Sequence, residues 1–230
     1  MTQATLTSAP TRMTAAKAGA IGGFVFAATL ILQNVMRGAA NVANDASAAT
    51  IMRNYADHRS AHWALTVVFV VGAFALVTFV ASLWTRLRDG ASAVPMRVGV
   101  LGTTLIMALF SMTVALDVAL TSYVHLGGAS PDIVRGLFVL HNAVFTILLL
   151  GIALALVGLV LASVAGGLIG SAWRTVAVLG ACALALSALA APVVTEGSGL
   201  FYVSAIGFAV WVVCLVRIAV ALWREPEPAY

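Results

Sequence analysis

Long apolar runs separated by short polar segments dominate the pattern of this chain. An α-helix rises about 1.5 Å per residue, so about 20 apolar residues cross the roughly 30 Å hydrocarbon core of a bilayer. The runs that meet this requirement are residues 17–37, 62–84, 97–122, 135–163, 173–194 and 200–222. The pattern therefore predicts an all-α, polytopic bundle of about six transmembrane helices.

The segments between and around these runs predict the rest of the organisation. Residues 1–16 are rich in Thr and Ala without apolar periodicity, and we expect a flexible tail there. Residues 38–61 are too polar to cross a membrane, but Asp45 precedes a helix-compatible stretch, which predicts a short interfacial helix before the second span. Residues 17–224 then form one transmembrane domain, and residues 225–230 form a short C-terminal tail.

Composition excludes a soluble globular domain. Hydrophobic residues make up 62% of the chain and charged residues only 9%, with a mean hydropathy of +1.07, whereas soluble domains carry about 25% charged residues. The 12 basic residues are dispersed rather than clustered, which argues against nucleic-acid binding. The expected partner is the lipid bilayer, and a homo-oligomer or a partner in a membrane complex remains open.

The basic residues also predict an orientation, because cytoplasmic ends of spans carry an excess of Lys and Arg. With a cytoplasmic N-terminus, one side holds eight of them and the other side holds four. The eight inner residues are Arg12, Lys17, Arg86, Arg88, Arg97, Arg174, Arg217 and Arg224. The four outer residues are Arg37, Arg53, Arg59 and Arg135. We therefore expect both termini on the cytoplasmic side.

All four histidines fall at the outer ends of spans under this topology. Neutral imidazole is the commonest metal ligand in proteins. His58 and His62 are four residues apart, so a helix places both on one face, where they can share one metal ion. The candidate metal ligands are therefore His58, His62, His125 and His141. The alternative for the first three is that they are ordinary hydrated residues at the membrane surface.

Asp117 and His141 lie deepest among the ionisable side chains of the predicted outer half. Asp117 is eight residues before His125, about 12 Å along a helix, and His141 lies about two turns into the fourth span. Ionisable groups in hydrocarbon are costly and tend to mark functional sites. We identify His141 and Asp117 as candidate cofactor-binding residues. The alternative is a structural hydrogen-bonded pair that joins the third and fourth spans.

Three classes of function fit this pattern. The first is a module that holds a metal ion or haem through the histidines, with Asp117 accepting a hydrogen bond from the second ring nitrogen of a histidine that binds it. The second is a small transporter or proton-coupled carrier, in which Asp117 and His141 relay protons. The third is a structural or accessory subunit of a membrane complex. The sequence identifies no catalytic residue, so enzymatic activity remains open.

The order of features in the first 120 residues carries a resemblance. These features are the loop segments Asp45-Ala-Ser-Ala-Ala-Thr-Ile and Asn54-Tyr-Ala-Asp-His-Arg, and the span end Leu83-Trp-Thr-Arg-Leu-Arg. Their placement resembles a bacterial family of six- or seven-span integral membrane proteins catalogued as a domain of unknown function. The resemblance implies a helical bundle in a bacterial cytoplasmic membrane and brings no catalytic residues with it.

Overall fold

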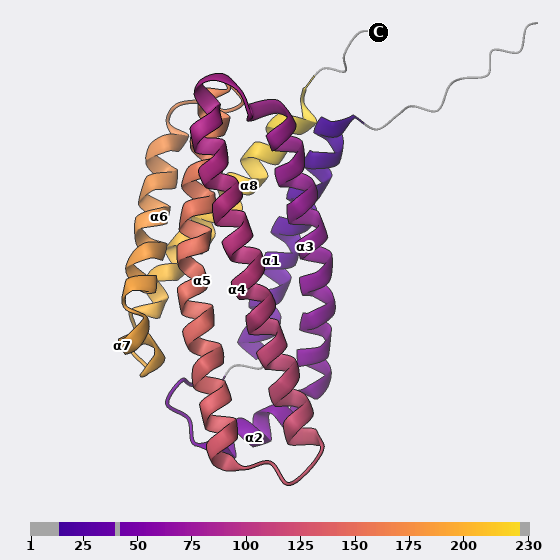
Figure 1. Ribbon diagram of the computed structural model, residues 1–230, viewed down its shortest axis with the longest axis vertical. Coiled ribbons are helices and arrows are strands. Elements are labelled where there is room, and N and C mark those ends of the chain that lie inside the picture. Colours follow the sequence, from indigo (N-terminus) through magenta and orange to yellow (C-terminus); the bar gives the residue numbers. More distant parts are fainter. Residues whose placement is uncertain (1–13, 40–41, 226–230) are drawn as a thin grey trace, which may run out of the picture.

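The computed structural model describes residues 14–39 and 42–225, and every regular element among them is helical (Figure 1). Most of the predicted tails, residues 1–13 of 1–16 and 226–230 of 225–230, lies outside the described residues, and Ala15 and Ala16 already belong to α1. The elements are α1 (Ala15–Ala39), α2 (Ala48–Asp57), α3 (Arg59–Leu87), η1 (Gly90–Ser92), α4 (Ala93–His125), α5 (Pro131–Ala165), α6 (Trp173–Leu189), α7 (Ala191–Thr195) and α8 (Phe201–Trp223). The prediction of an all-α bundle is confirmed.

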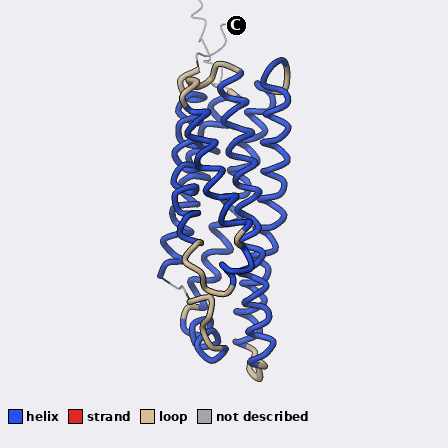
Figure 2. The backbone as a smooth tube through the Cα atoms, turned by 90° about the vertical axis from the view of Figure 1, so that its left-hand side faces the viewer, coloured by secondary structure: helices blue, strands red, loops and turns tan. Residues whose placement is uncertain are grey.

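Six long helices form a closed ring around an apolar core. In the order α1, α3, α4, α5, α6 and α8, each helix packs against the next, and α8 packs back against α1. Figure 2 shows these helices running side by side along the longest dimension of the molecule. Trp211, Phe79 and Leu156 are almost completely buried between them. Sequential neighbours are antiparallel because short loops join most of them.

Five of the described helices are long and apolar enough to cross a membrane, namely α1, α3, α4 with η1, α5 and α8. The sixth apolar helix, α6, has only 17 residues. The predicted span over 173–194 therefore ends too late, because the helix stops at Leu189 and the five-residue α7 follows with Pro192 in its first turn. Proline has no backbone N–H and its ring clashes with the carbonyl four residues earlier, so a continuous helix through Pro192 is unfavourable.

Glycines let α4 and α5 approach closely along their length. A Cβ atom added at Gly158 would overlap the backbone of Gly99, and one added at Gly102 would overlap the backbone of Ala155. Small residues at such seams bring helix backbones into van der Waals contact. This contact fixes α4 and α5 against each other, so the side chains that face each other farther along these two helices are also fixed.

The predicted short helix before the second span is present as α2. It begins after Ser47, whose hydroxyl accepts a hydrogen bond from the backbone N–H of Thr50 at 3.3 Å. It ends at His58, where the backbone leaves helical geometry (φ −106°, ψ 23°) before α3 starts. This break lets α2 lie across the end of the bundle (Figure 1), with Ile51 and Tyr55 buried beneath it.

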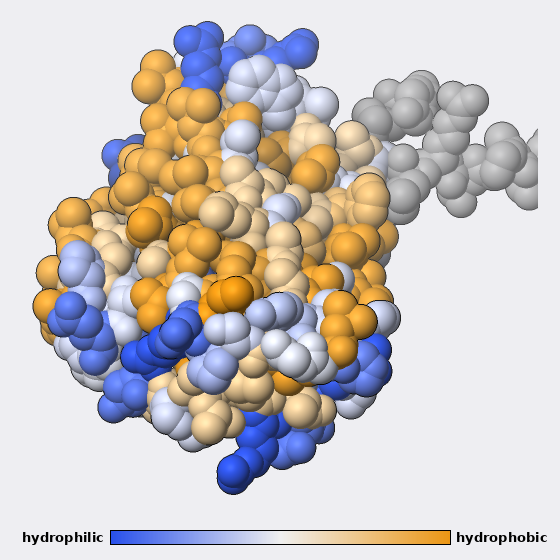
Figure 3. Space-filling view, turned by 60° about the horizontal axis from the view of Figure 1, so that its bottom comes forward, coloured by the Kyte–Doolittle hydropathy of each residue, from blue (hydrophilic) through white to orange (hydrophobic). Residues whose placement is uncertain are grey.

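The start of α1 and the end of α8 lie at the opposite end of the bundle from α2 (Figure 1). There, Ser82 donates a hydrogen bond to the carbonyl of Ala15 at 2.6 Å, and Arg86 pairs with Glu225 at 2.8 Å. Figure 3 shows hydrophobic residues over the flanks and hydrophilic residues gathered on the end that carries α2. A belt of apolar surface between two polar ends is the distribution that a bilayer requires.

Candidate functional site: a polar pocket beneath α2

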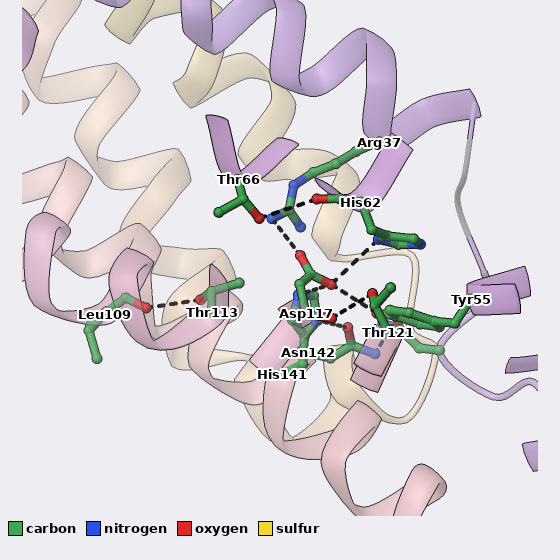
Figure 4. Close-up of polar contacts among 11 residues, drawn as sticks. Arg37, Tyr55, His62, Thr66, Leu109, Thr113, Asp117, Thr121, His141 and Asn142 are labelled. Carbon is green, nitrogen blue, oxygen red and sulfur yellow. Dashed lines mark hydrogen bonds and ion pairs between the residues drawn. The ribbon is translucent and has the colours of Figure 1, made fainter. Parts of the chain in front are cut away.

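Asp117 is the centre of a buried polar cluster in the half of the bundle next to α2 (Figure 4). It lies in α4, eight residues before the end of that helix, and is 5% exposed. Its carboxylate meets side chains from α1, α2, α3 and α5, and its own backbone carbonyl accepts a hydrogen bond from Thr121 at 2.7 Å. Five helices therefore meet at one carboxylate.

Arg37 supplies the positive charge that balances Asp117. It lies in the last turn of α1, and its Nη2 is 3.3 Å from Oδ2 of Asp117. The guanidinium also lies 5.1 Å from the ring centroid of Phe145 and 5.9 Å from that of Phe110. Cation–π contacts of this kind favour a fixed orientation of the group. Removing a buried carboxylate from water is unfavourable without such a counter-charge.

Tyr55 connects α2 to the same carboxylate. Its hydroxyl donates a hydrogen bond to Oδ1 of Asp117 at 2.9 Å. Burial raises the pKa of Tyr55 well above its usual value, and the negative charge of Asp117 and the hydrogen bond to it act in the same direction. The phenol therefore stays protonated and remains a donor. It also stacks on the imidazole of His62, with ring centroids 4.2 Å apart and an angle of 10° between the planes.

A chain of hydrogen bonds connects His141 to α7. The backbone carbonyl at one end of this chain determines which atom donates in each bond. The carbonyl of Val194 can only accept, so it receives the bond from Nδ2 of Asn44 at 2.9 Å. The Oδ1 atom of Asn44 then accepts from Nδ2 of Asn142 at 3.1 Å. Consequently Oδ1 of Asn142 points to Nδ1 of His141, 3.1 Å away, and it accepts the proton of that nitrogen.

This direction leaves the other ring nitrogen of His141 facing Asp117. Nε2 of His141 lies 3.3 Å from Oδ1 of Asp117, close enough for an ion pair but without the alignment of a good hydrogen bond. A neutral imidazole donates from one nitrogen only. Since Nδ1 donates to Asn142, the contact between Nε2 and the carboxylate is favourable only when the ring carries both protons.

His62 is the least satisfied polar group of the cluster. Its side chain is 8% exposed, yet neither ring nitrogen has a hydrogen-bond partner among the described residues. Nδ1 lies 3.8 Å from Oδ1 of Asp117, which is too far for a hydrogen bond. Buried polar groups in folded proteins are usually satisfied by protein, water or a ligand. His62 therefore has two ring nitrogens without hydrogen-bond partners, and its side chain lines the space beside it.

That space is a cavity of about 400 Å³, which we call the α2 pocket. Its polar lining includes Arg37, His62, Asp117, His141 and Asn142, and its apolar lining includes Leu65, Phe138 and Phe145. Its lining also includes Asn44 and Asp45 before α2 and Gly197 and Ser198 before α8. The volume falls in the range of about 300–1,000 Å³ that small-molecule sites occupy.

A second, small cavity of about 30 Å³ lies next to the α2 pocket, and Arg37 and Asn34 line both spaces. The rings of Phe26 and Trp211, which also line the small cavity, meet edge to face, with centroids 6.5 Å apart and an angle of 76° between the planes. Trp211 is only 1% exposed. Most residues that line this second cavity are apolar.

The structure brings together three of the five residues singled out from the sequence, namely His62, Asp117 and His141. Asp117 and His141, for which the sequence left a structural pair as one alternative, lie in contact at 3.3 Å. His58 instead caps α2, where Nδ1 donates to the carbonyl of Asn54 at 3.1 Å, and His125 is exposed at the end of α4. Within the described ranges, no group of three or more His, Cys, Asp or Glu side chains is placed to hold a metal ion.

Sequence reasoning missed Arg37, Tyr55 and Asn44 as members of the site. The sequence shows Arg37 only as a charge at the end of a span, and it gives no chemical role to Tyr55. One signal was available for Arg37, because a buried aspartate in a neighbouring span needs a counter-charge. No sequence signal indicates Asn44, since its role depends on how the segment before α2 folds over α5 and α7.

No family model, no curated protein and no solved structure matches this chain. The functional conclusions below therefore depend on the geometry of the pocket.

Proposed function

We propose that this chain is a multi-pass membrane protein that binds a small organic molecule in the α2 pocket. The observation that carries the proposal is His62, whose two ring nitrogens are buried without partners beside a cavity of about 400 Å³. An unpartnered buried polar group costs about 1–3 kcal/mol. A ligand group that hydrogen-bonds to one of these ring nitrogens reduces this penalty and gains affinity from doing so.

The composition of the pocket supports an organic ligand. Small-molecule sites combine apolar walls with a few polar groups that fix the orientation of the ligand. Phe138 and Phe145 provide such walls, and Arg37, His62 and His141 provide such groups. The polar groups come from three different helices, α1, α3 and α5. A ligand that contacts all of them should therefore stabilise the packing of these helices.

The pocket favours this function over the other classes that fit the sequence. A divalent cation at His62, Asp117 and His141 would lie beside the guanidinium of Arg37. The two positive charges would repel each other, which disfavours a metal site. A carrier needs a polar path through the bundle to the other side of the membrane. The contact of the apolar rings of Phe26 and Trp211 does not support such a path. Binding at one end of the bundle requires neither a metal nor a path.

The proposed setting is a bacterial cytoplasmic membrane with both termini inside. The eight-to-four distribution of basic residues supports this orientation. The start of α1 and the end of α8 lie at one end of the bundle, as an even number of crossings requires (Figure 1). We propose α6 as the sixth crossing, because it packs between α5 and α8. The α2 pocket then faces the outside of the cell, and the resemblance of residues 1–120 to a bacterial membrane family agrees with this setting.

A thermal-stability screen of the purified full chain in detergent tests the proposal. The panel contains small carboxylates, amines, neutral alcohols and amides, haem, and Zn²⁺ or Ni²⁺ ions. We expect at least one organic compound to raise the unfolding temperature of the wild type but not that of His62→Ala. His125→Ala is the matched control, because its side chain is exposed outside the pocket, and it should keep the response.

A screen without any organic compound that acts in this way would overturn the proposal. Stabilisation by Zn²⁺, Ni²⁺ or haem that depends on His62 and His141 would overturn it in favour of the metal or haem module predicted from the sequence.

A further inference from the structure

We infer that the ligand of the α2 pocket is a small organic carboxylate, bound with its charged group toward Arg37 and its apolar part against Phe138 and Phe145. This inference rests on the proposed binding function and adds the chemical class of the ligand. It follows from what the cluster around Asp117 leaves available to an incoming molecule.

The carboxylate of Asp117 is already occupied. Oδ1 accepts from the hydroxyl of Tyr55 and faces Nε2 of His141 at 3.3 Å, and Oδ2 pairs with Arg37. A cationic ligand would need this carboxylate and would have to displace one of those partners. It would also have to approach the guanidinium of Arg37, which repels it. The buried negative charge therefore acts as an internal counter-ion and not as a free binding group.

The groups that remain available are mainly donors. Arg37 carries five N–H groups, and one hydrogen bond, to Asp117, is formed by its guanidinium within the described part of the chain. The Arg37 side chain is 24% exposed and lines the pocket. Charge-assisted hydrogen bonds from Arg to a carboxylate can be bidentate, and they are about twice as strong as neutral ones. Arg37 can therefore bind a ligand carboxylate without releasing Asp117.

Arg37 also sets the sign of the charge that the pocket favours. It is a cation that lines the pocket, and its guanidinium has N–H groups beyond the one bonded to Asp117. A ligand carboxylate is attracted to this group, whereas a cationic ligand is repelled. Asp45 also lines the pocket, but its side chain is exposed, so solvent and salt screen its effect on a ligand near Arg37.

The remaining walls set the size and polarity of the rest of the ligand. Phe138, Phe145 and Leu65 form an apolar side of the cavity. The ring of Phe145 also contacts the guanidinium of Arg37 at 5.1 Å. An anion held by Arg37 therefore lies next to an aromatic surface, which suits a carboxylate attached to a ring or a short hydrocarbon chain more than a bare inorganic anion.

Three probes of nearly the same shape and different charge test this inference, namely benzoate, benzamide and benzamidinium. Binding to the full chain in detergent is measured by calorimetry and by saturation-transfer NMR. We expect benzoate to bind at least about tenfold more tightly than benzamide, which corresponds to about 1.4 kcal/mol, and benzamidinium to bind most weakly. Equal affinities, tighter binding of benzamidinium, or no binding of benzoate would overturn the inference.

Matched variants attribute the preference to Arg37. The double variant Arg37→Gln with Asp117→Asn removes both charges together, so it avoids a buried unpaired carboxylate, and it should reduce the preference for benzoate over benzamide to about twofold or less. Arg53→Gln removes an exposed arginine from α2 and should leave the preference unchanged. A double variant that folds and keeps the preference would also overturn the inference.

The two proposals can fail separately. If the wider panel contains an amine or a neutral compound whose stabilising effect depends on His62, while benzoate does not bind, the carboxylate inference is wrong and the binding function stands. If no organic compound acts through His62, both are wrong.

Discussion

The hydroxyl of Tyr55 donates a hydrogen bond to Oδ1 of Asp117 at 2.9 Å, and this bond joins residues 62 positions apart in the sequence. Tyr55 lies in α2 and Asp117 lies in α4, so the bond fastens the helix across the end of the bundle to the buried cluster (Figure 4). The apolar contacts of Ile51 with the ends of α4 and α5 act beside it. The position of α2 over the pocket is thus coupled to the buried carboxylate of Asp117.

Replacing Tyr55 by Phe should loosen α2 without unfolding the bundle. The variant keeps the ring but loses a hydrogen bond to a charged group, which contributes about 1.5–3 kcal/mol. We expect faster amide hydrogen exchange in residues 48–57 and little change in α6 or α8. Tyr123→Phe is a matched control, because it removes another hydroxyl near this end, one that accepts from the backbone N–H of Ser130. Equal exchange in wild type and Tyr55→Phe would contradict the role of this bond.

Arg37 and Asp117 should show a characteristic order of stabilities in a double-mutant cycle. Arg37→Gln leaves a buried carboxylate without its main counter-charge, whereas Asp117→Asn leaves a guanidinium that is partly exposed. We expect Arg37→Gln to be the less stable single variant and Asp117→Asn to restore part of its stability, with a coupling energy of about 0.5–3 kcal/mol. Unfolding in mixed micelles measures this energy. Strictly additive losses would show that the pair does not interact.

Hydropathy predicted the long helices because crossing a bilayer imposes both length and apolarity on them. It also indicated a pair of Asp117 and His141 as one of two alternatives, because two ionisable groups at similar depth in neighbouring spans are both costly when unpaired. It could not show that α6 ends at Leu189, since the residues from 190 to 194 remain apolar after the helix stops. Local backbone geometry near Pro192, rather than polarity, ends that helix.

The rest of the site depends on tertiary structure. Depth placed all four histidines toward one side, but depth does not say which way a side chain points, and His58 and His125 turn away from Asp117. Tyr55 enters the cluster because the chain breaks at His58 and α2 folds across the bundle. Such a break has no hydropathy signal, so a contact between α2 and α4 could not be predicted from the sequence.

The seam between α4 and α5 should be intolerant of even one methyl group. Gly158→Ala places a Cβ atom against the backbone of Gly99, which cannot move without separating the two helices. We expect a loss of about 1–3 kcal/mol, measured as a lower unfolding temperature in detergent. Gly136→Ala is the control on the same helix, because no atom lies within 4 Å of the added Cβ. Similar stabilities of the two variants would contradict the close packing.

Tyr55 should make the protein less stable in alkaline solution. The unfolded phenol has the ordinary pKa of about 10, and the folded pKa is raised by burial and by Asp117. Above about pH 10 the unfolded state therefore loses this proton while the folded state keeps it, so stability falls by up to about 1.4 kcal/mol per pH unit. Unfolding temperatures between pH 9 and pH 11 should fall more for the wild type than for Tyr55→Phe. Parallel curves would contradict the burial of an un-ionised phenol.

The ¹⁵N NMR spectrum of the histidine-labelled protein is the most direct test of ligand binding in the α2 pocket. The chain has four histidines, and single substitutions assign their signals if the purification tag contains none. On addition of the carboxylate that stabilises the protein most in the screen, we predict shifts for His62 and His141 and constant signals for His58 and His125. Unchanged signals for His62 and His141 at saturating ligand, or shifts confined to His58 and His125, would contradict the account.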